Sequence, residues 1–274
     1  MTSAPPVHGR GRRRAGPTAA SRALLGTLGL VGVAALFEII PRVGLVSPHF
    51  MPPFTQMIAA LVREASERAF WRALLDTTSG WALGLLISVV AGVVLGVIIG
   101  SLRGLRAFTA STIEFLRPIP SVALVPIAVL LWGAQLRSTL LLVVYASFWP
   151  ILVQVIHGVA DVDPVARDTA ASYRFTPWAK IRYLLLPTGL PYIMTGLRLS
   201  GTVALILAIT AELVIGTPGL GKEIGIAAAS SAVPAVYALI FVVGLFGVAV
   251  NVGFRGLERR ALAWHTSVRL EAAT

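Results

Sequence analysis

Six apolar segments, each close to the length that a helix needs to cross a lipid bilayer, dominate this sequence. They cover residues 23–40, 77–100, 113–132, 139–158, 192–215 and 235–254. Backbone polar groups find no water inside a bilayer, so segments of this kind are expected to be helical. Charged residues make up only 13% of the 274 residues, about half the share that is usual in a soluble domain. The sequence therefore predicts an all-α polytopic membrane protein with six transmembrane helices.

The first apolar segment, residues 23–40, has a second interpretation. The preceding residues, 1–22, carry five arginines, and a basic region before an apolar one is also typical of a cleaved signal peptide. The segment is long for a signal core, contains Glu38 and lacks a small-x-small cleavage site before Pro41. We therefore interpret residues 1–22 as a basic tail and residues 23–40 as the first span.

The distribution of basic residues predicts the orientation. Six spans place both ends on one side, and that side holds sixteen Lys and Arg residues, Arg103, Arg106 and Arg117 among them, against six on the other side. Positive charge accumulates on the cytoplasmic side, so both termini and residues 159–187 are expected there. The same bias explains the net charge of +11. The sequence has no basic face with interleaved aromatic residues, so it does not indicate nucleic-acid binding. The predicted organisation is a six-span domain at 23–254 between basic cytoplasmic tails at 1–22 and 255–274.

Small residues and prolines interrupt the pattern within the membrane region. Residues 41–76 contain several prolines and then an amphipathic stretch, which predicts a helix at the outer interface. Gly92, Gly96 and Gly100 recur at four-residue spacing, a stripe that lets another helix approach closely.

The third segment, 113–132, contains three prolines and is expected to form one kinked span. Prolines free backbone carbonyls, which are tolerated at membrane depth where they face protein or a water-filled path. Pro120 and Pro126 are therefore candidates for lining a transport pathway, and simple helix packing is the alternative.

Two charged residues lie within the fifth segment. Arg198 and Glu212 are candidates for the pathway because charged side chains are costly to place in a bilayer. Fourteen residues separate them, roughly 21 Å along a helix, so they cannot pair within one straight helix. Arg198 can instead reach the cytoplasmic interface. Glu212 needs a partner on another helix, a wet cavity or a position at the outer interface.

The polar stretch at residues 161–191 predicts a pair of helices outside the bilayer. Asp163-Pro164 and Thr176-Pro177 each combine a capping residue with a proline at the first helical position. An alanine-rich run follows the first start, and Pro187 is expected to end the second helix. A helix pair of this kind indicates contact with a soluble partner.

Several kinds of chemistry find no support in the sequence. The chain has no cysteine, and its histidines (His8, His49, His157 and His265) have no ligand spacing, so we expect no metal site. It contains no GxxxxGK[ST] phosphate loop, and the glycines at 216–221 are interpreted as turn formers in an outer loop. We therefore expect no catalytic residue, and an energy source in another chain.

Motifs across residues 50–265 resemble the EAA-loop signature of binding-protein-dependent ABC importer permeases, in particular the nitrate/sulfonate/taurine group. The matching residues are Val162-Asp163-Pro164, Asp168-Thr169-Ala170, Leu186-Pro187, Leu190-Pro191, Gly196-Leu197-Arg198, Ala211-Glu212, Arg117-Pro118-Ile119-Pro120 and Leu257-Glu258-Arg259-Arg260. The resemblance implies a type I importer permease fold in the bacterial inner membrane and a permease homodimer. It also implies a cytoplasmic ATPase subunit, which binds the ATP and Mg, and an extracytoplasmic substrate-binding protein. No cofactor is expected on this chain.

The resemblance also implies a coupling helix that docks into the ATPase. Asp168 takes the place of the leading glutamate of the family motif, and the implied contact residues are Asp168, Thr169, Ala170, Ala171, Tyr173, Arg174, Phe175 and Trp178. Arg174 falls where the family has glycine, and a left-handed conformation there costs a non-glycine residue about 1–2 kcal/mol. Either the turn is built differently, or Arg174 accepts the strain and adds a charged contact.

The resulting prediction is an ATP-driven importer permease for a small solute, a small anion such as nitrate, a sulfonate or taurine. The outer side has a net charge of about +2, which is compatible with an anion and does not choose one. The alternatives are an ion-coupled secondary transporter, for which no internal repeat is evident, and a membrane scaffold that only recruits a partner.

Overall fold

The computed structural model describes residues 19–263, which are almost entirely helical and contain no strand. Within this range the chain divides into two compact units, with the boundary in the sequence between Met57 and Ile58, and each is described by itself. Helix α1 (Ala19–Arg42) and the first residues of α2 (Phe54–Ser66) form the first unit. The predicted tail at 1–22 lies almost wholly outside the described residues, since α1 already begins at Ala19.

In the first unit, Glu38 connects the end of α1 to the start of α2. Its carboxylate accepts hydrogen bonds from the backbone N–H of Thr55 at 2.9 Å and from the Thr55 hydroxyl at 3.1 Å. It also pairs with Arg42, one turn later in α1. A carboxylate at a helix N-terminus is favoured by the unpaired N–H groups there, so Glu38 stabilises the first turn of α2.

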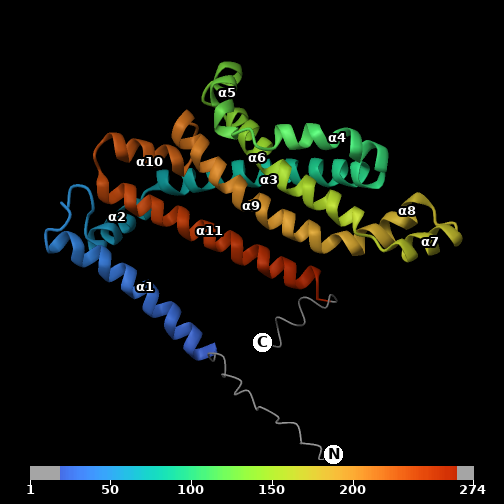
Figure 1. Cartoon of the computed structure of the whole chain (residues 1–274). Helices are drawn as coiled ribbons and strands as arrows, with labels where there is room; N and C mark the ends of the chain where they lie inside the picture. The colour runs from blue at the N-terminus through green and yellow to red at the C-terminus, as the bar shows by residue number, and fades with distance from the viewer. Residues whose placement is uncertain (1–18, 264–274) are drawn as a thin grey trace, which may run out of the picture. The chain divides into compact units, whose positions relative to one another are not determined.

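The second unit is a helical bundle (Figure 1), in which α3, α6, α9 and α11 run lengthwise. Its elements are α3 (Arg68–Ser101), α4 (Arg103–Leu116), η1 (Ser121–Leu124), α5 (Val125–Trp132), α6 (Leu136–Ala160), α7 (Pro164–Ser172), α8 (Pro177–Lys180), η2 (Ile181–Leu185), α9 (Leu186–Ile215), α10 (Leu220–Ala229) and α11 (Val233–Ala261). The prediction of an all-α fold is confirmed. The proposed domain limits at residues 23 and 254 stay predictions.

The glycine stripe of α3 is the surface on which α6 packs. A Cβ built at Gly92 would overlap the Cγ2 of Ile151, and one at Gly96 would lie 2.7 Å from the Cβ of Val155. At Gly100 the same construction comes within 2.9 Å of Val159. The close helix approach expected from this spacing is therefore present, and side chains on α6 occupy the space that the glycines leave.

Buried hydroxyls join α3, α6 and α9 at the middle of this contact. The Oγ atoms of Ser88 and Ser147 lie 2.7 Å apart, and Ser200 donates to the carbonyl of Ser147 at 2.6 Å. Each hydroxyl finds a partner on a neighbouring helix, as polar groups in an apolar environment require. The three helices are therefore held in register by hydrogen bonds as well as by close packing.

The third predicted span is broken. Helix α4 and the helical segment η1–α5 are long and apolar enough for one span only when taken together, and they are bent by 80°. Pro118 and Pro120 follow α4 directly, and a proline disfavours helical geometry in the residue before it. The interruption expected at the prolines is therefore present, but it is a sharp break and not a kink, and the first helix begins at Arg103, well before the predicted residue 113. The described residues contain five helices long and apolar enough to span, or six with this pair counted as one.

Two other predicted boundaries are also wrong. The amphipathic stretch that was expected to continue to Asp76 ends with α2 at Ser66, and α3 begins at Arg68, well before the predicted residue 77. Pro187 does not end a helix, because the π-helical segment η2 leads directly into α9, and Pro187 is the second residue of α9. The helix that begins at Pro177 is therefore continuous with the fifth span, from Pro177 to Ile215.

The glycines at 216–221 form the expected turn, but a helix follows them that the sequence did not reveal. Gly216 ends α9 in the left-handed conformation at φ 79°, and Gly219 has φ 150°. Helix α10 then begins at Leu220, which is fully buried. With Phe70 and Ala73 of α3 and Leu239 of α11, Leu220 belongs to one apolar cluster.

Candidate functional site

The helix pair formed by α7 and α8 projects beyond one end of the bundle (Figure 1), the end at which α11 finishes. Both predicted helix starts are present. Asp163 accepts a hydrogen bond from the N–H of Val165 at 2.7 Å, and Thr176 accepts one from Ala179 at 3.2 Å. These caps satisfy N–H groups that have no partner inside their own helices.

The turn between the two helices places Arg174 in the left-handed conformation, with φ 52°. The N–H of Arg174 bonds to the carbonyl of Ala171, and the N–H of Phe175 bonds to that of Ala170, each at 2.9 Å. This pair of bonds is the Schellman motif, which normally has glycine at the left-handed position. Of the two alternatives left open by the sequence, the chain adopts the one in which Arg174 accepts the strain.

Three contacts hold the base of the α7–α8 element to the bundle. The hydroxyl of Tyr192, on α9, donates to Asp161 at 2.7 Å. The guanidinium of Arg167 donates to the carbonyl of Val159, at the end of α6, at 3.2 Å. Val162 and Ala170 are buried. The element is therefore anchored on both α6 and α9.

The outer surface of the α7–α8 element carries most of the predicted coupling residues. Tyr173 is 76% exposed and Trp178 is 69% exposed, which is unusual for aromatic side chains of this size. Asp168, Thr169, Ala171, Arg174 and Phe175 are also exposed, and Ala170 alone of the predicted set faces inward. Exposed aromatic residues grouped in this way are typical of a protein–protein contact.

Replacing Arg174 with glycine is expected to stabilise the α7–α8 turn, since glycine adopts the left-handed conformation without strain. We expect a gain of about 1 kcal/mol in the free energy of unfolding, seen as a higher melting temperature of the purified chain in detergent. Ser231 offers a matched control, because it lies at φ 56° in a similar turn after α10. Ser231→Gly should give a similar gain, and a lower melting temperature for Arg174→Gly alone would contradict the strain argument.

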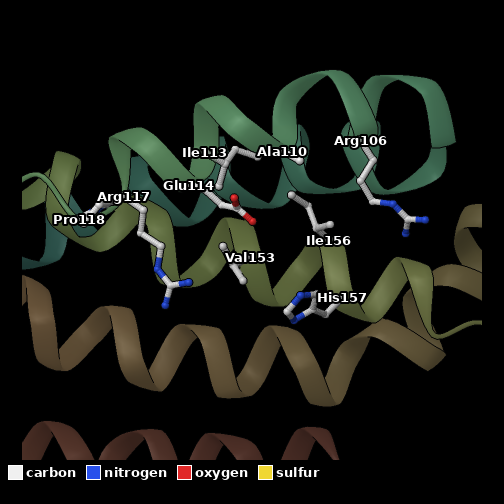
Figure 2. Close-up of a pocket in the computed structure, with 9 residues that line it drawn as sticks. All are labelled: Arg106, Ala110, Ile113, Glu114, Arg117, Pro118, Val153, Ile156 and His157. Atoms are coloured by element: carbon white, nitrogen blue, oxygen red, sulfur yellow. The ribbon is translucent and has the colours of Figure 1, made fainter.

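A cavity of about 770 Å³ lies between α4 and α6. Figure 2 shows Glu114 and Arg117 directed from α4 towards α6, with Arg106 towards the other end of the cavity and His157 on α6. The remaining lining residues are Ala110, Ile113, Pro118, Val153 and Ile156. The cavity is therefore mostly apolar, with four titratable side chains along it.

Arg117 does not lie where the count of Lys and Arg residues on the two sides of the membrane placed it. The hydroxyl of Tyr145 donates to the carbonyl of Leu116 at 2.7 Å, and Tyr145 lies well inside the 25-residue helix α6. Arg117 therefore lies well inside the span and not at the cytoplasmic end where the count placed it. Removing it leaves fifteen basic residues against six, so the orientation prediction is unchanged.

Glu212, predicted as a pathway residue, has partners on two other elements. Its Oε2 accepts hydrogen bonds from the hydroxyl of Thr77 at 2.8 Å and from the N–H of Gly221 at 2.9 Å. The Thr77 hydroxyl in turn accepts one from the N–H of Leu220 at 2.8 Å. Glu212 is only 2% exposed and borders a smaller cavity of about 300 Å³. Of the three possibilities left open by the sequence, a partner on another helix is thus present, in α3, and the side chain also borders a cavity.

The other predicted pathway residues lie apart from both cavities. Arg198 pairs with Glu258 of α11 at 3.6 Å, which links α9 to the last span. Pro120 and Pro126 are exposed at the break between α4 and α5 and line neither cavity. Their assignment to a pathway stays a prediction. In the described part of the chain, no group of three or more His, Cys, Asp or Glu residues could hold a metal ion.

The residues that sequence reasoning missed are those of the large cavity. Neither Glu114 nor Arg106 was among the predicted site residues, and Arg117 was counted only with the cytoplasmic basic residues. A signal was present, because Glu114 and Arg117 are three residues apart directly before two prolines. That spacing places both on one face of a helix that ends at membrane depth.

Comparison with known proteins agrees with this architecture. Residues 88–262 match the family model of the binding-protein-dependent transport system inner membrane component. The taurine transport system permease protein TauC of Escherichia coli is 29% identical over 251 residues, which cover 89% of this chain and 91% of that protein. The putative aliphatic sulfonates transport permease protein SsuC of Bacillus subtilis is 27% identical over 86% of this chain and 85% of that protein.

A solved structure of the MetNI methionine ABC transporter, in an inward-facing conformation, shares the fold. It superposes with a TM-score of 0.61 at 15% sequence identity, and covers 70% of this chain and 96% of the matched chain. The fold is therefore that of a type I ABC importer permease. The family model covers well over half of the chain, and its match includes the α7–α8 element and both cavity-lining helices. The chain belongs to the family of binding-protein-dependent transport system inner membrane components.

Proposed function

We propose that this chain is the membrane subunit of an ATP-driven importer and that its α7–α8 element docks on a cytoplasmic ATPase. The observation that carries the proposal is the exposed, anchored helix pair at the end of the bundle, with Tyr173 and Trp178 on its surface. An element of this kind, in a chain that resembles permeases, fits a contact through which another subunit supplies energy. ATP and Mg would bind to that subunit, and this chain performs no covalent chemistry.

The geometry supports a direct mechanical link from the docking surface to the spans. Helix α8, the π-helical η2 and α9 form one continuous helical stretch from Pro177 to Ile215. A force applied at Trp178 therefore acts on the fifth span without an intervening flexible loop. The Tyr192–Asp161 hydrogen bond couples the same movement to the end of α6. Closure of two ATPase subunits would in this way reorient α6 and α9 and switch access across the bilayer.

The remaining parts of the proposal follow from the family and from the charge pattern. A homodimer of this chain would form the pathway, and a separate extracytoplasmic binding protein would deliver the solute. The chain would lie in a bacterial inner membrane with both termini in the cytoplasm, as the distribution of Lys and Arg indicates. The proposed solutes are small molecules with an anionic sulfonate group, because the relatives TauC and SsuC are named for taurine and aliphatic sulfonates.

The test is a charge reversal on the docking surface. Asp168→Lys should reduce ATP-driven uptake by at least about tenfold, because placing a like charge in a protein contact costs several kcal/mol. Asp168 is exposed, so the chain should still fold and insert. Uptake of taurine and ethanesulfonate is measured in vesicles that contain the permease, its ATPase and its binding protein.

A matched control keeps this test specific. Glu67→Lys reverses an exposed carboxylate at the start of α3, away from the α7–α8 element, and should leave uptake within about twofold of the wild type. Normal ATP-driven uptake by correctly inserted Asp168→Lys would refute the docking role. Uptake that survives ATP depletion but collapses with the membrane potential would instead indicate an ion-coupled transporter.

A further inference from the structure

The cavity between α4 and α6 is the least explained feature of the bundle. Arg106, Arg117 and His157 line it together with one carboxylate, that of Glu114. With His157 neutral, the four groups carry a net charge of +1. A cavity with apolar walls strengthens the field of the charges that line it, so a net positive charge favours an anion inside.

Arg117 occupies a costly position. The hydrogen bond from Tyr145 to the carbonyl of Leu116 places the end of α4 beside the interior of α6, away from either end of that span. Charged side chains at such a depth face the protein interior or a water-filled cavity and mark solute or ion pathways. Arg117 lines the cavity together with Glu114, and both side chains are exposed there.

The charged groups of the cavity have no partners of their own within residues 19–263. Arg42 pairs with Glu38 and Arg198 pairs with Glu258, but the side chains of Arg106, Glu114 and Arg117 make no ion pair or hydrogen bond in this range. Glu114 and Arg117 are three residues apart on α4 and still do not close on each other. Their charges therefore remain available to a ligand.

We propose that this cavity is an anion-binding station on the solute pathway, in which Arg117 binds the anionic group and Glu114 keeps that binding weak. The proposal rests on the function proposed above and identifies where the solute meets the membrane subunit. A guanidinium provides a fork of donors that matches a sulfonate or carboxylate. A site on a pathway must also release its ligand, and a carboxylate one turn away repels a bound anion.

The cavity also offers a second position for the anion. Arg106 lies eleven residues before Arg117 on α4, roughly 16 Å away along the helix. An anion leaving Arg117 can therefore pass to His157 and Arg106, towards the end of the bundle that carries α7 and α8. Successive weak sites of this kind permit passage where a single tight site would trap the solute.

The first experiment measures binding of radiolabelled ethanesulfonate to the full-length chain in phosphatidylcholine nanodiscs. Arg117→Gln should weaken binding by about tenfold, since it removes charge-assisted hydrogen bonds. Glu114→Gln should tighten binding about threefold, because the carboxylate that repels the anion is gone. Arg117→Lys should give an intermediate value. Arg103→Gln, at an exposed position on α4 outside the cavity, should match the wild type.

The opposite directions expected for Arg117→Gln and Glu114→Gln separate a binding role from a loss of fold, which would weaken both. Unchanged binding by Arg117→Gln would overturn the proposal. A second outcome would also overturn it: if phosphatidylglycerol in the nanodiscs abolished ethanesulfonate binding to the wild type, the site would hold a lipid headgroup. Binding of ethyltrimethylammonium as tight as that of ethanesulfonate would overturn it as well.

A second arm distinguishes failure of this site from failure of the proposed function. In vesicles with the ATPase and binding protein, Arg117→Gln should lose uptake and keep ATP hydrolysis that the loaded binding protein stimulates. Glu114→Gln should lower both KM and the maximal rate. ATP-driven uptake that is normal in Arg117→Gln would overturn the site and leave the importer function intact. Wild-type uptake without ATP dependence would overturn the importer function, and the nanodisc measurements would still decide the site.

Discussion

Gly92→Leu should prevent assembly of the helix bundle. Even a Cβ at this position would overlap the Cγ2 of Ile151 and lie 3.3 Å from the backbone nitrogen of Leu152. Ile151 is fully buried and the backbone of α6 cannot yield as a flexible side chain can, so α3 and α6 must separate. Overpacking of this kind costs about 1–3 kcal/mol for a single group, and a leucine adds several. We expect loss of the folded monodisperse species in detergent, measured by gel filtration and by the melting temperature.

A control of the same chemistry is available on α11. Gly244 has no heavy atom within 4 Å of a Cβ built on it, so Gly244→Leu should leave the melting temperature almost unchanged. A double-mutant cycle tests the assigned contact directly. Gly92→Ala destabilises the chain, and Ile151→Ala should relieve part of that effect by removing the overlapping atom. Strictly additive changes would show that Ile151 is not the obstacle.

The apolar runs predicted the spans well because their signal is long and continuous. The predicted segments 139–158 and 235–254 correspond to α6 and α11. Their ends agree within a few residues, except that α11 continues further, to Ala261. Short elements carry no such signal. Helix α10 has only ten residues, and its position depends on Glu212 and Thr77, which are far apart in the sequence. Local sequence cannot encode a helix start that a distant side chain stabilises.

The candidate site was predictable where its geometry is local. The caps at Asp163 and Thr176 and the strain at Arg174 depend on neighbouring residues, so the helix pair could be placed from sequence. The depth of Arg117 was not predictable in this way. A basic residue next to prolines is equally typical of a cytoplasmic loop, and only the 80° break between α4 and α5 brings it inside the span.

Glu212→Ala should detach the start of α10 from α9. The carboxylate accepts the N–H of Gly221 and the hydroxyl of Thr77, both buried, and alanine leaves these donors without a partner. An unsatisfied buried donor costs about 1–3 kcal/mol, and the lost side chain adds a cavity. We expect a melting temperature lower by several degrees and faster proteolysis after Gly216, measured on the purified chain in detergent.

Two further variants separate the hydrogen bonds from the space that the side chain fills. Glu212→Gln keeps an oxygen acceptor and nearly the same volume, so its melting temperature should stay close to that of the wild type. Thr77→Val keeps the volume of Thr77 but removes both its donor and the acceptor for the N–H of Leu220, so it should approach Glu212→Ala. If Thr77→Val were neutral while Glu212→Ala remained destabilising, packing and not hydrogen bonding would hold α10. If Glu212→Gln were as damaging as Glu212→Ala, the carboxylate would have a role that these two hydrogen bonds do not explain.

The contact of α9 with α10 and α3 thus depends on one acceptor oxygen, Oε2 of Glu212. The three variants measure how much of the stability of this contact comes from that atom.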